Sequence, residues 1–204
     1  MDVNDIEWFS RDEKLSFDVR RSIILGHYMH EWGMPEYRVI TSKSSRKTYV
    51  EIYYFPAGKR SDVSRFATIG LSTALRPSGS PVSAEWMLAL TSDLGGESSD
   101  RIFGYIVDLI AHHIENAKNS ITPIVMPESE IAPDKWSTKA LLIDELRGES
   151  EKLDDIKVGV ESVPVLWLIP ISKKEVDIIS NEGIEKFDEI IEGASYSIVD
   201  PRRP

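Results

Sequence analysis

The chain has 204 residues, of which 41% are hydrophobic, and it contains no cysteine. This length is enough to bury a core as one domain, and the lack of cysteine excludes disulfides, thiolate nucleophiles, zinc ribbons and iron–sulfur clusters. No apolar run approaches the roughly 20 residues of a membrane helix, and the acidic start, Met1 to Glu7, is unlike a secretory signal. We therefore expect a single domain over residues 1–204, located in the cytoplasm.

The formal net charge of −10 is divided unevenly along the chain. Residues 1–127 carry 16 acidic and 14 basic side chains (net −2), whereas residues 128–204 carry 18 acidic and 10 basic ones (net −8). An acidic surface in the second part repels nucleic-acid phosphates and favours basic protein partners. The alternative is that this charge only keeps a cytosolic protein soluble.

The first predicted elements are a helix and a β-hairpin. A helix is expected over 17–32, within an N-terminal helical segment of about 1–33, because aromatic and apolar residues recur on one face. They are Phe17, Ile24, Tyr28 and Trp32. Alternation of side chains predicts a half-exposed strand over 48–55, which forms a hairpin with a strand over 37–41.

Two more strands and a helix are predicted before the middle of the chain. The segment 65–72 is short and apolar, and Gly70 within it indicates a bulge or a close backbone approach. A loop over 74–81 leads to a strand over 85–90. A helix over 100–116 follows, with an apolar stripe wide enough to be well covered.

The second half of the chain continues the same mixture of elements. Strands are predicted at 124–126, 140–143 and 163–169, helices at 173–181 and 184–192, and an edge strand at 196–199. The intervening segment 144–155 is too charged for a core and is expected to face solvent. Together these elements predict an α+β fold: a mixed, mainly antiparallel sheet with helices packed against it.

Histidines offer the main hypothesis for catalysis. His27, His30 and Glu31 share a predicted helix, but the pattern differs from the His-Glu-x-x-His of zinc enzymes. We interpret them as surface residues, and the same holds for His112, whereas His113 falls on the apolar stripe of its helix. A metal-dependent hydrolase that uses His27, His30 or His112 is retained as an alternative.

Other enzyme signatures are absent from the sequence. Ser72 lacks the Gly-x-Ser-x-Gly frame of a hydrolase nucleophile, and Gly95-Gly96 is not part of a phosphate-binding loop. The charged segment 144–155 contains Glu149, Glu151, Asp154 and Asp155. A solvated segment is unlike the environment of a catalytic acid–base pair. We interpret these acids as a solvated face, and no cofactor is expected.

Exposed aromatic residues would suit a contact surface. The candidates are Tyr49, Tyr53 and Trp136.

The order of several segments resembles the Suppressor-of-fused family in its short, single-domain bacterial form. The resemblance covers roughly residues 50–204. It rests on Arg65-Phe-Ala-Thr-Ile-Gly-Leu-Ser72, Ala84-Glu-Trp-Met-Leu-Ala-Leu90, the helix at 100–116, Ala140-Leu-Leu-Ile143, Val163 to Ile171 with Glu175 and Gly183, and the terminal Asp-Pro-Arg-Arg-Pro.

This resemblance implies protein binding without catalysis. Animal members bind a transcription factor of the Hedgehog pathway, and bacterial single-domain members are assigned as immunity proteins that neutralise polymorphic toxins. The chain lacks the second domain of the animal form, so the interdomain peptide clamp of that form does not carry over. The implied function is therefore that of an immunity protein with a toxin partner, which the charge suggests is basic.

We place the predicted partner-binding surface on the acidic segment before the long apolar strand. Its residues are Glu145, Glu149, Glu151, Asp154 and Asp155. Another alternative is an intracellular regulator that binds a peptide at an exposed sheet edge. Neither nucleic acid nor a membrane is expected as a partner, and the oligomeric state is left open.

Overall fold

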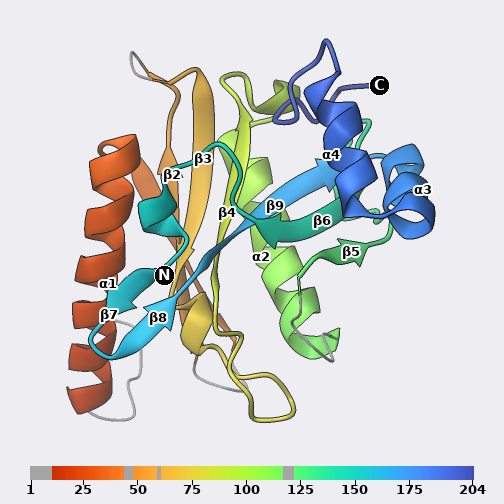
Figure 1. Cartoon of the computed structure of the whole chain (residues 1–204). Coiled ribbons are helices and arrows are strands. Elements are labelled where there is room, and N and C mark those ends of the chain that lie inside the picture. Colours follow the sequence, from red (N-terminus) through yellow and green to blue (C-terminus); the bar gives the residue numbers. More distant parts are fainter. Residues whose placement is uncertain (1–10, 44–47, 59–60, 117–121) are drawn as a thin grey trace.

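The computed structural model describes residues 11–43, 48–58, 61–116 and 122–204. Within these residues the main sheet has seven strands (Figure 1). In sheet order they are β1 (Tyr37–Lys43), β2 (Thr48–Phe55), β3 (Val63–Ile69), β4 (Glu85–Thr91), β9 (Val165–Ile171), β6 (Ala140–Glu145) and β5 (Ile124–Met126). All neighbours pair antiparallel except β4 and β9, which are parallel. The predicted α+β class with a mixed, mainly antiparallel sheet is confirmed.

Helices cover both faces of the sheet. They are α1 (Arg11–Trp32), α2 (Ser99–Asn116), α3 (Lys173–Glu182) and α4 (Ile184–Glu192). The short elements are η2 (Leu71–Thr73), η3 (Leu94–Gly96), η4 (Glu151–Leu153) and a hairpin of β7 (Ile156–Val158) and β8 (Glu161–Val163). Within the described ranges of the chain, no helix is both long enough and apolar enough to cross a membrane.

The central strand β4 is buried on both faces, which explains its continuous apolar sequence. Trp86, Leu88 and Leu90 pack in the core under α2, whereas Met87 and Ala89 belong to the core that contains α1 and α4 residues. A strand covered on both sides can carry apolar residues at every position. The sheet therefore separates two hydrophobic cores and contributes side chains to both.

Helix α1 starts earlier than predicted but uses the expected face. Its described residues begin at Arg11, and Ile24 and Tyr28 are fully buried. Strand β3 ends at Ile69, before the predicted end at residue 72, because Gly70 has a φ of +99° and leads into η2. A Cβ at Gly70 would lie 2.5 Å from the Tyr49 carbonyl oxygen, so the predicted close backbone approach is confirmed.

Helix α2 buries the predicted stripe, including one histidine. His113 is 5% exposed, and its ring packs edge to face on Trp86, with 4.9 Å between the ring centres. Burial lowers the pKa of His113 from 6.5 to about 4, with smaller contributions from the charges of Arg76 and His112. The imidazole is therefore a neutral part of the core.

The neutral His113 is expected to make stability depend on pH. As the pH falls from 7 to 5, the unfolded state binds a proton at His113 and the folded state does not. The free energy of unfolding should therefore fall by about 2 kcal/mol from this residue. Urea unfolding at both pH values should show a weaker pH dependence in His113→Phe than in the parent. The exposed neighbour gives the comparison, His112→Phe, which keeps the buried His113 and should therefore retain more of the parent's pH dependence than His113→Phe; equal pH dependence in all three proteins would contradict the account.

Several predictions for the second half need correction. Pro170 does not end the strand: β9 continues to Ile171, because β4 pairs only with Val165 to Leu168 and leaves Pro170 bonded on one side. Residues 196–199 form turns rather than an edge strand.

Two of the three predicted exposed aromatics are buried. Tyr53 is 4% and Trp136 is 2% exposed, because each faces a core, and only Tyr49 is partly exposed.

Candidate functional site

A crevice opens at the end of the sheet where β4 and β9 begin. Five parts of the chain line it: the loop before β4, the start of β9, the end of β6, Thr122 before β5 and Asp154 after residues 151–153. The cavity has a volume of about 640 Å³. Its lining includes Arg76, Pro81, Val82, Ser83, Ala84, Thr122, Glu145, Leu146, Asp154, Pro164, Val165 and Leu166.

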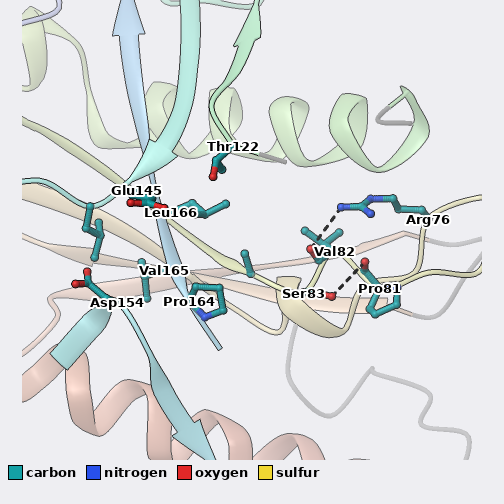
Figure 2. Close-up of a pocket in the computed structure, with 12 residues that line it drawn as sticks. Arg76, Pro81, Val82, Ser83, Thr122, Glu145, Asp154, Pro164, Val165 and Leu166 are labelled. Atoms are coloured by element: carbon teal, nitrogen blue, oxygen red, sulfur yellow. Dashed lines mark hydrogen bonds between the residues drawn. The ribbon is translucent and has the colours of Figure 1, made fainter. Parts of the chain in front are cut away.

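The two walls of the crevice differ in charge. Glu145 at the end of β6 and Asp154 after η4 lie on one side, and Arg76, Pro81 and Ser83 lie on the other (Figure 2). Both acids are exposed, whereas Arg76 is only 7% exposed, so the accessible charge at the mouth is negative. Ser83 has a φ of +69°, a left-handed conformation that non-glycine residues adopt only where the surroundings impose it.

The five predicted partner-binding acids occupy different environments. Glu145 and Asp154 share the crevice, whereas Glu151 and Asp155 are exposed on η4 and the turn after it. Asp155 forms an exposed ion pair with Lys157 at 2.5 Å. These four acids remain available for contact with another molecule.

Glu149 is different, because its carboxylate is used inside the protein. Its Oε1 lies 2.7 Å from Nε of Arg65, and its Oε2 accepts a hydrogen bond of 2.8 Å from the indole of Trp32. Only 12% of its side chain is exposed. Glu149 therefore ties the 144–155 segment to α1 and β3, and we assign it a structural role.

The segment 144–155 is not an excursion into solvent throughout. Leu153 is fully buried in the core beside α1, and Asp144 is 6% exposed. Arg147 forms ion pairs with both Asp144 and Asp188 of α4. The expectation of a solvated segment is therefore wrong for these residues, because Leu153 packs in a core and Asp144 is neutralised by Arg147.

The histidine hypothesis gains no geometric support. Lys152 Nζ lies 3.4 Å from Nε2 of His30. The ammonium group of Lys152 therefore occupies the position at which a metal ion bound to this nitrogen would lie. His112 contacts Asn116 of its own helix. Among the residues that the structure describes, no three His, Cys, Asp or Glu side chains are grouped to hold a metal ion.

Peptide addition requires an end strand that has a neighbour on one side only. In the part of the chain that the structure describes, β1 and β5 are the two end strands of the sheet, each paired with one neighbour.

Sequence reasoning missed the second wall of the crevice. Arg76 lies within the segment 74–81, which the sequence predicts only as a loop between strands, and Ser83 lies two residues after that segment. The proline, glycine and serine content of 74–81 marks a turn, but it does not reveal that the turn faces Glu145 and Asp154 about 60 to 80 residues later. For Glu145 this proximity comes from two pairings: β4 lies parallel to β9, and β9 lies antiparallel to β6, so the starts of β4 and β9 meet the end of β6.

Comparison with protein families identifies the relatives of this chain. The profile of the family described as Suppressor of fused protein (SUFU) matches residues 46–204. The chain belongs to the SUFU family. The resemblance noted in the sequence is thereby confirmed over most of the chain.

Solved structures share the fold of this SUFU-family chain. A crystal structure of a SUFU homologue from Neisseria gonorrhoeae has 11% sequence identity and a TM-score of 0.68, over 91% of this chain and 95% of the homologue. The structure of the Sufu–Fu complex gives 12% identity and a TM-score of 0.57, over 86% and 84% of the two chains. Drosophila Suppressor of Fused gives 12% identity and a TM-score of 0.54, over 77% of this chain but only 42% of the fly chain. Comparison with curated protein sequences gives no match.

Proposed function

We propose that this chain acts as one SUFU-family domain that binds a toxin domain in the cytoplasm and neutralises it without catalysis. The observation that carries the proposal is the acid-walled crevice on a SUFU-family fold. Its accessible charges come from Glu145 and Asp154, in the part of the chain with a net charge of −8. The partner that fits this surface is a basic protein domain.

Inhibition would arise from coverage of the toxin surface. Exposed acids at the rim of an interface accelerate encounter with a basic partner more than they increase affinity. Glu151 and Asp155 are exposed near the crevice and extend its negative field. The complex would therefore form quickly at low salt and more slowly as salt screens these charges.

Charge reversal on this surface is expected to slow association. The variant carries the changes Glu145→Lys, Glu151→Lys, Asp154→Lys and Asp155→Lys. Glu149 is left intact because its loss would disturb the contact with Arg65. With the domain encoded by the adjacent reading frame as the probe, stopped-flow mixing at low salt should show association slowed by about tenfold or more, with a flatter salt dependence.

A matched control separates this surface from the total charge. Exposed acids on α3 and α4, at the other end of the sheet, allow the same change of charge. They give Asp177→Lys, Glu182→Lys, Glu185→Lys and Glu192→Lys. Equal slowing in both variants would show that only net charge matters, and unchanged rates in the crevice variant would remove this surface from the proposal.

Neutralisation itself has a direct readout. Cells that express the toxin domain should grow when the parent chain is co-expressed and should fail to grow without it. No rescue and no complex would contradict the immunity function. In the metal-dependent alternative, purified protein would contain bound metal and would lose activity on chelation; metal-free protein that still rescues growth would exclude this alternative.

A further inference from the structure

The loop between η2 and β4 is a projecting hairpin rather than an irregular connection. Leu75 and Pro81 form a β-bridge, and Val82 N donates a hydrogen bond of 2.9 Å to the Ala74 carbonyl. We call residues 74–83 the 74–83 hairpin. It extends beyond the end of the sheet, at the lower edge of Figure 1.

Hydrogen bonds and prolines hold the tip of this hairpin in one conformation. Gly79 N donates to the Arg76 carbonyl and Arg76 N donates to the Ser80 carbonyl, both at 2.9 Å. Pro77 occupies the turn, and Pro81 follows it. Because the turn is formed in the free protein, binding through it would cost little conformational entropy.

The base of the hairpin is fixed to the body of the protein. Ala74, Arg76 and Val82 are buried, with exposed fractions of 0%, 7% and 4%. The Arg76 guanidinium donates to the Val82 carbonyl at 3.4 Å and lies close enough to His113 of α2 to lower its pKa. Alternate residues thus anchor the hairpin while the remaining ones point outward.

The outward residues have the composition of a contact surface. Leu75 is 47% exposed, and every residue from 77 to 81 is exposed. Residues 77–83 contain no charged side chain. Across the crevice from Pro81 and Ser83, at the end of this uncharged segment, lie the exposed charges of Glu145 and Asp154.

We propose that the 74–83 hairpin enters a concave surface of the protein partner as a preformed wedge. The partner this shape fits is a folded domain with a cleft that has an uncharged floor, which receives Pro77 to Pro81, and a basic rim, which meets Glu145 and Asp154. This inference rests on the proposed function and adds to it the shape of the partner surface. Insertion into a cleft explains how a small domain would block access to an active site.

Added bulk at the tip tests insertion. Ser78 and Ser80 are exposed, so the variant Ser78→Trp with Ser80→Trp should fold normally. A tip that enters a cleft cannot accommodate two indoles, and affinity for the domain encoded by the adjacent reading frame, measured by calorimetry, should weaken by at least about tenfold. The matched control is Ser180→Trp with Ser195→Trp, on exposed sites far from the hairpin, which should change the dissociation constant less than about twofold.

The outcomes separate the two proposals. If the parent binds and the tip variant binds equally well, the wedge is contradicted and the proposed function stands. If the parent does not bind, both are contradicted. Backbone ¹⁵N relaxation of the free protein gives a second test at the non-proline residues of the segment 75–82: order parameters near 0.85 are expected, and values below about 0.6 would contradict a preformed wedge.

Discussion

Replacement of Glu85 by leucine is expected to lower the free energy of unfolding by about 5 kcal/mol. The Glu85 carboxylate is completely buried and accepts hydrogen bonds from the backbone N–H groups of Gly70, Leu71 and Ser72, at 2.9, 3.1 and 3.1 Å. The hydroxyls of Ser72 and Thr68 also donate to it, both at 2.7 Å. Leucine would leave these donors buried without an acceptor, and each such group costs about 1 to 3 kcal/mol.

The measurement is urea unfolding of Glu85→Leu beside two comparison variants. Glu85→Gln keeps the shape and one acceptor oxygen but turns an NH₂ toward donors, so its stability should fall between those of Glu85→Leu and the parent. Glu182→Gln changes an exposed glutamate on α3 and should remain within about 0.5 kcal/mol of the parent. A loss below about 1 kcal/mol in Glu85→Leu would show that the η2 turn does not depend on this carboxylate.

Replacement of Arg203 by methionine is expected to cost about 3 to 5 kcal/mol. The Arg203 side chain is 0% exposed and pairs with Glu175 of α3, with 3.0 Å between Nε and Oε1. It also donates to the carbonyl oxygens of Pro170 at 2.6 Å and Ile198 at 2.9 Å. Loss of the guanidinium would leave the Glu175 carboxylate buried and unneutralised, which is the costly way to break a buried pair.

A double-mutant cycle in urea isolates this pair. Arg203→Met combined with Glu175→Gln removes the orphaned charge but keeps an acceptor for the Ser172 N–H, so it should recover at least about 1 kcal/mol relative to Arg203→Met. The adjacent Arg202 is 40% exposed, and Arg202→Met should leave the stability close to that of the parent. Equal losses of stability in the two arginine variants would contradict the role of Arg203 as the residue that anchors residues 200–204 to α3.

Local patterns predicted most elements because their causes are local. The apolar stripe of α2 and the capping box of Ser172 with Glu175 at the start of α3 require only residues within a few turns. Strand β2 carries Val50, Ile52 and Tyr54 into the α2 core, as its alternation predicts. These features follow from helical and strand periodicity, which is visible in the sequence. The prediction that the other face of β2 is exposed is wrong, because Glu51 and Tyr53 are buried there.

The roles of the charged residues were less predictable. Glu149 looked like part of a solvated acidic face, but its partners Arg65 and Trp32 lie 84 and 117 residues away in the sequence. Glu85 gave no signal because its strand is apolar on both sides and its donors come from the turn after β3. An ionised side chain can be buried only where such partners converge, and convergence is a property of the folded chain.

By itself, the sequence determined the class of fold, the family and the negative charge of the second part, since these depend on composition, periodicity and the order of segments. The tertiary structure alone decided which acids are exposed, and it joined Glu145 and Asp154 to the 74–83 hairpin in one crevice. The physical reason is the pairing of β9 with β4 on one side and with β6 on the other, which brings together segments separated by tens of residues.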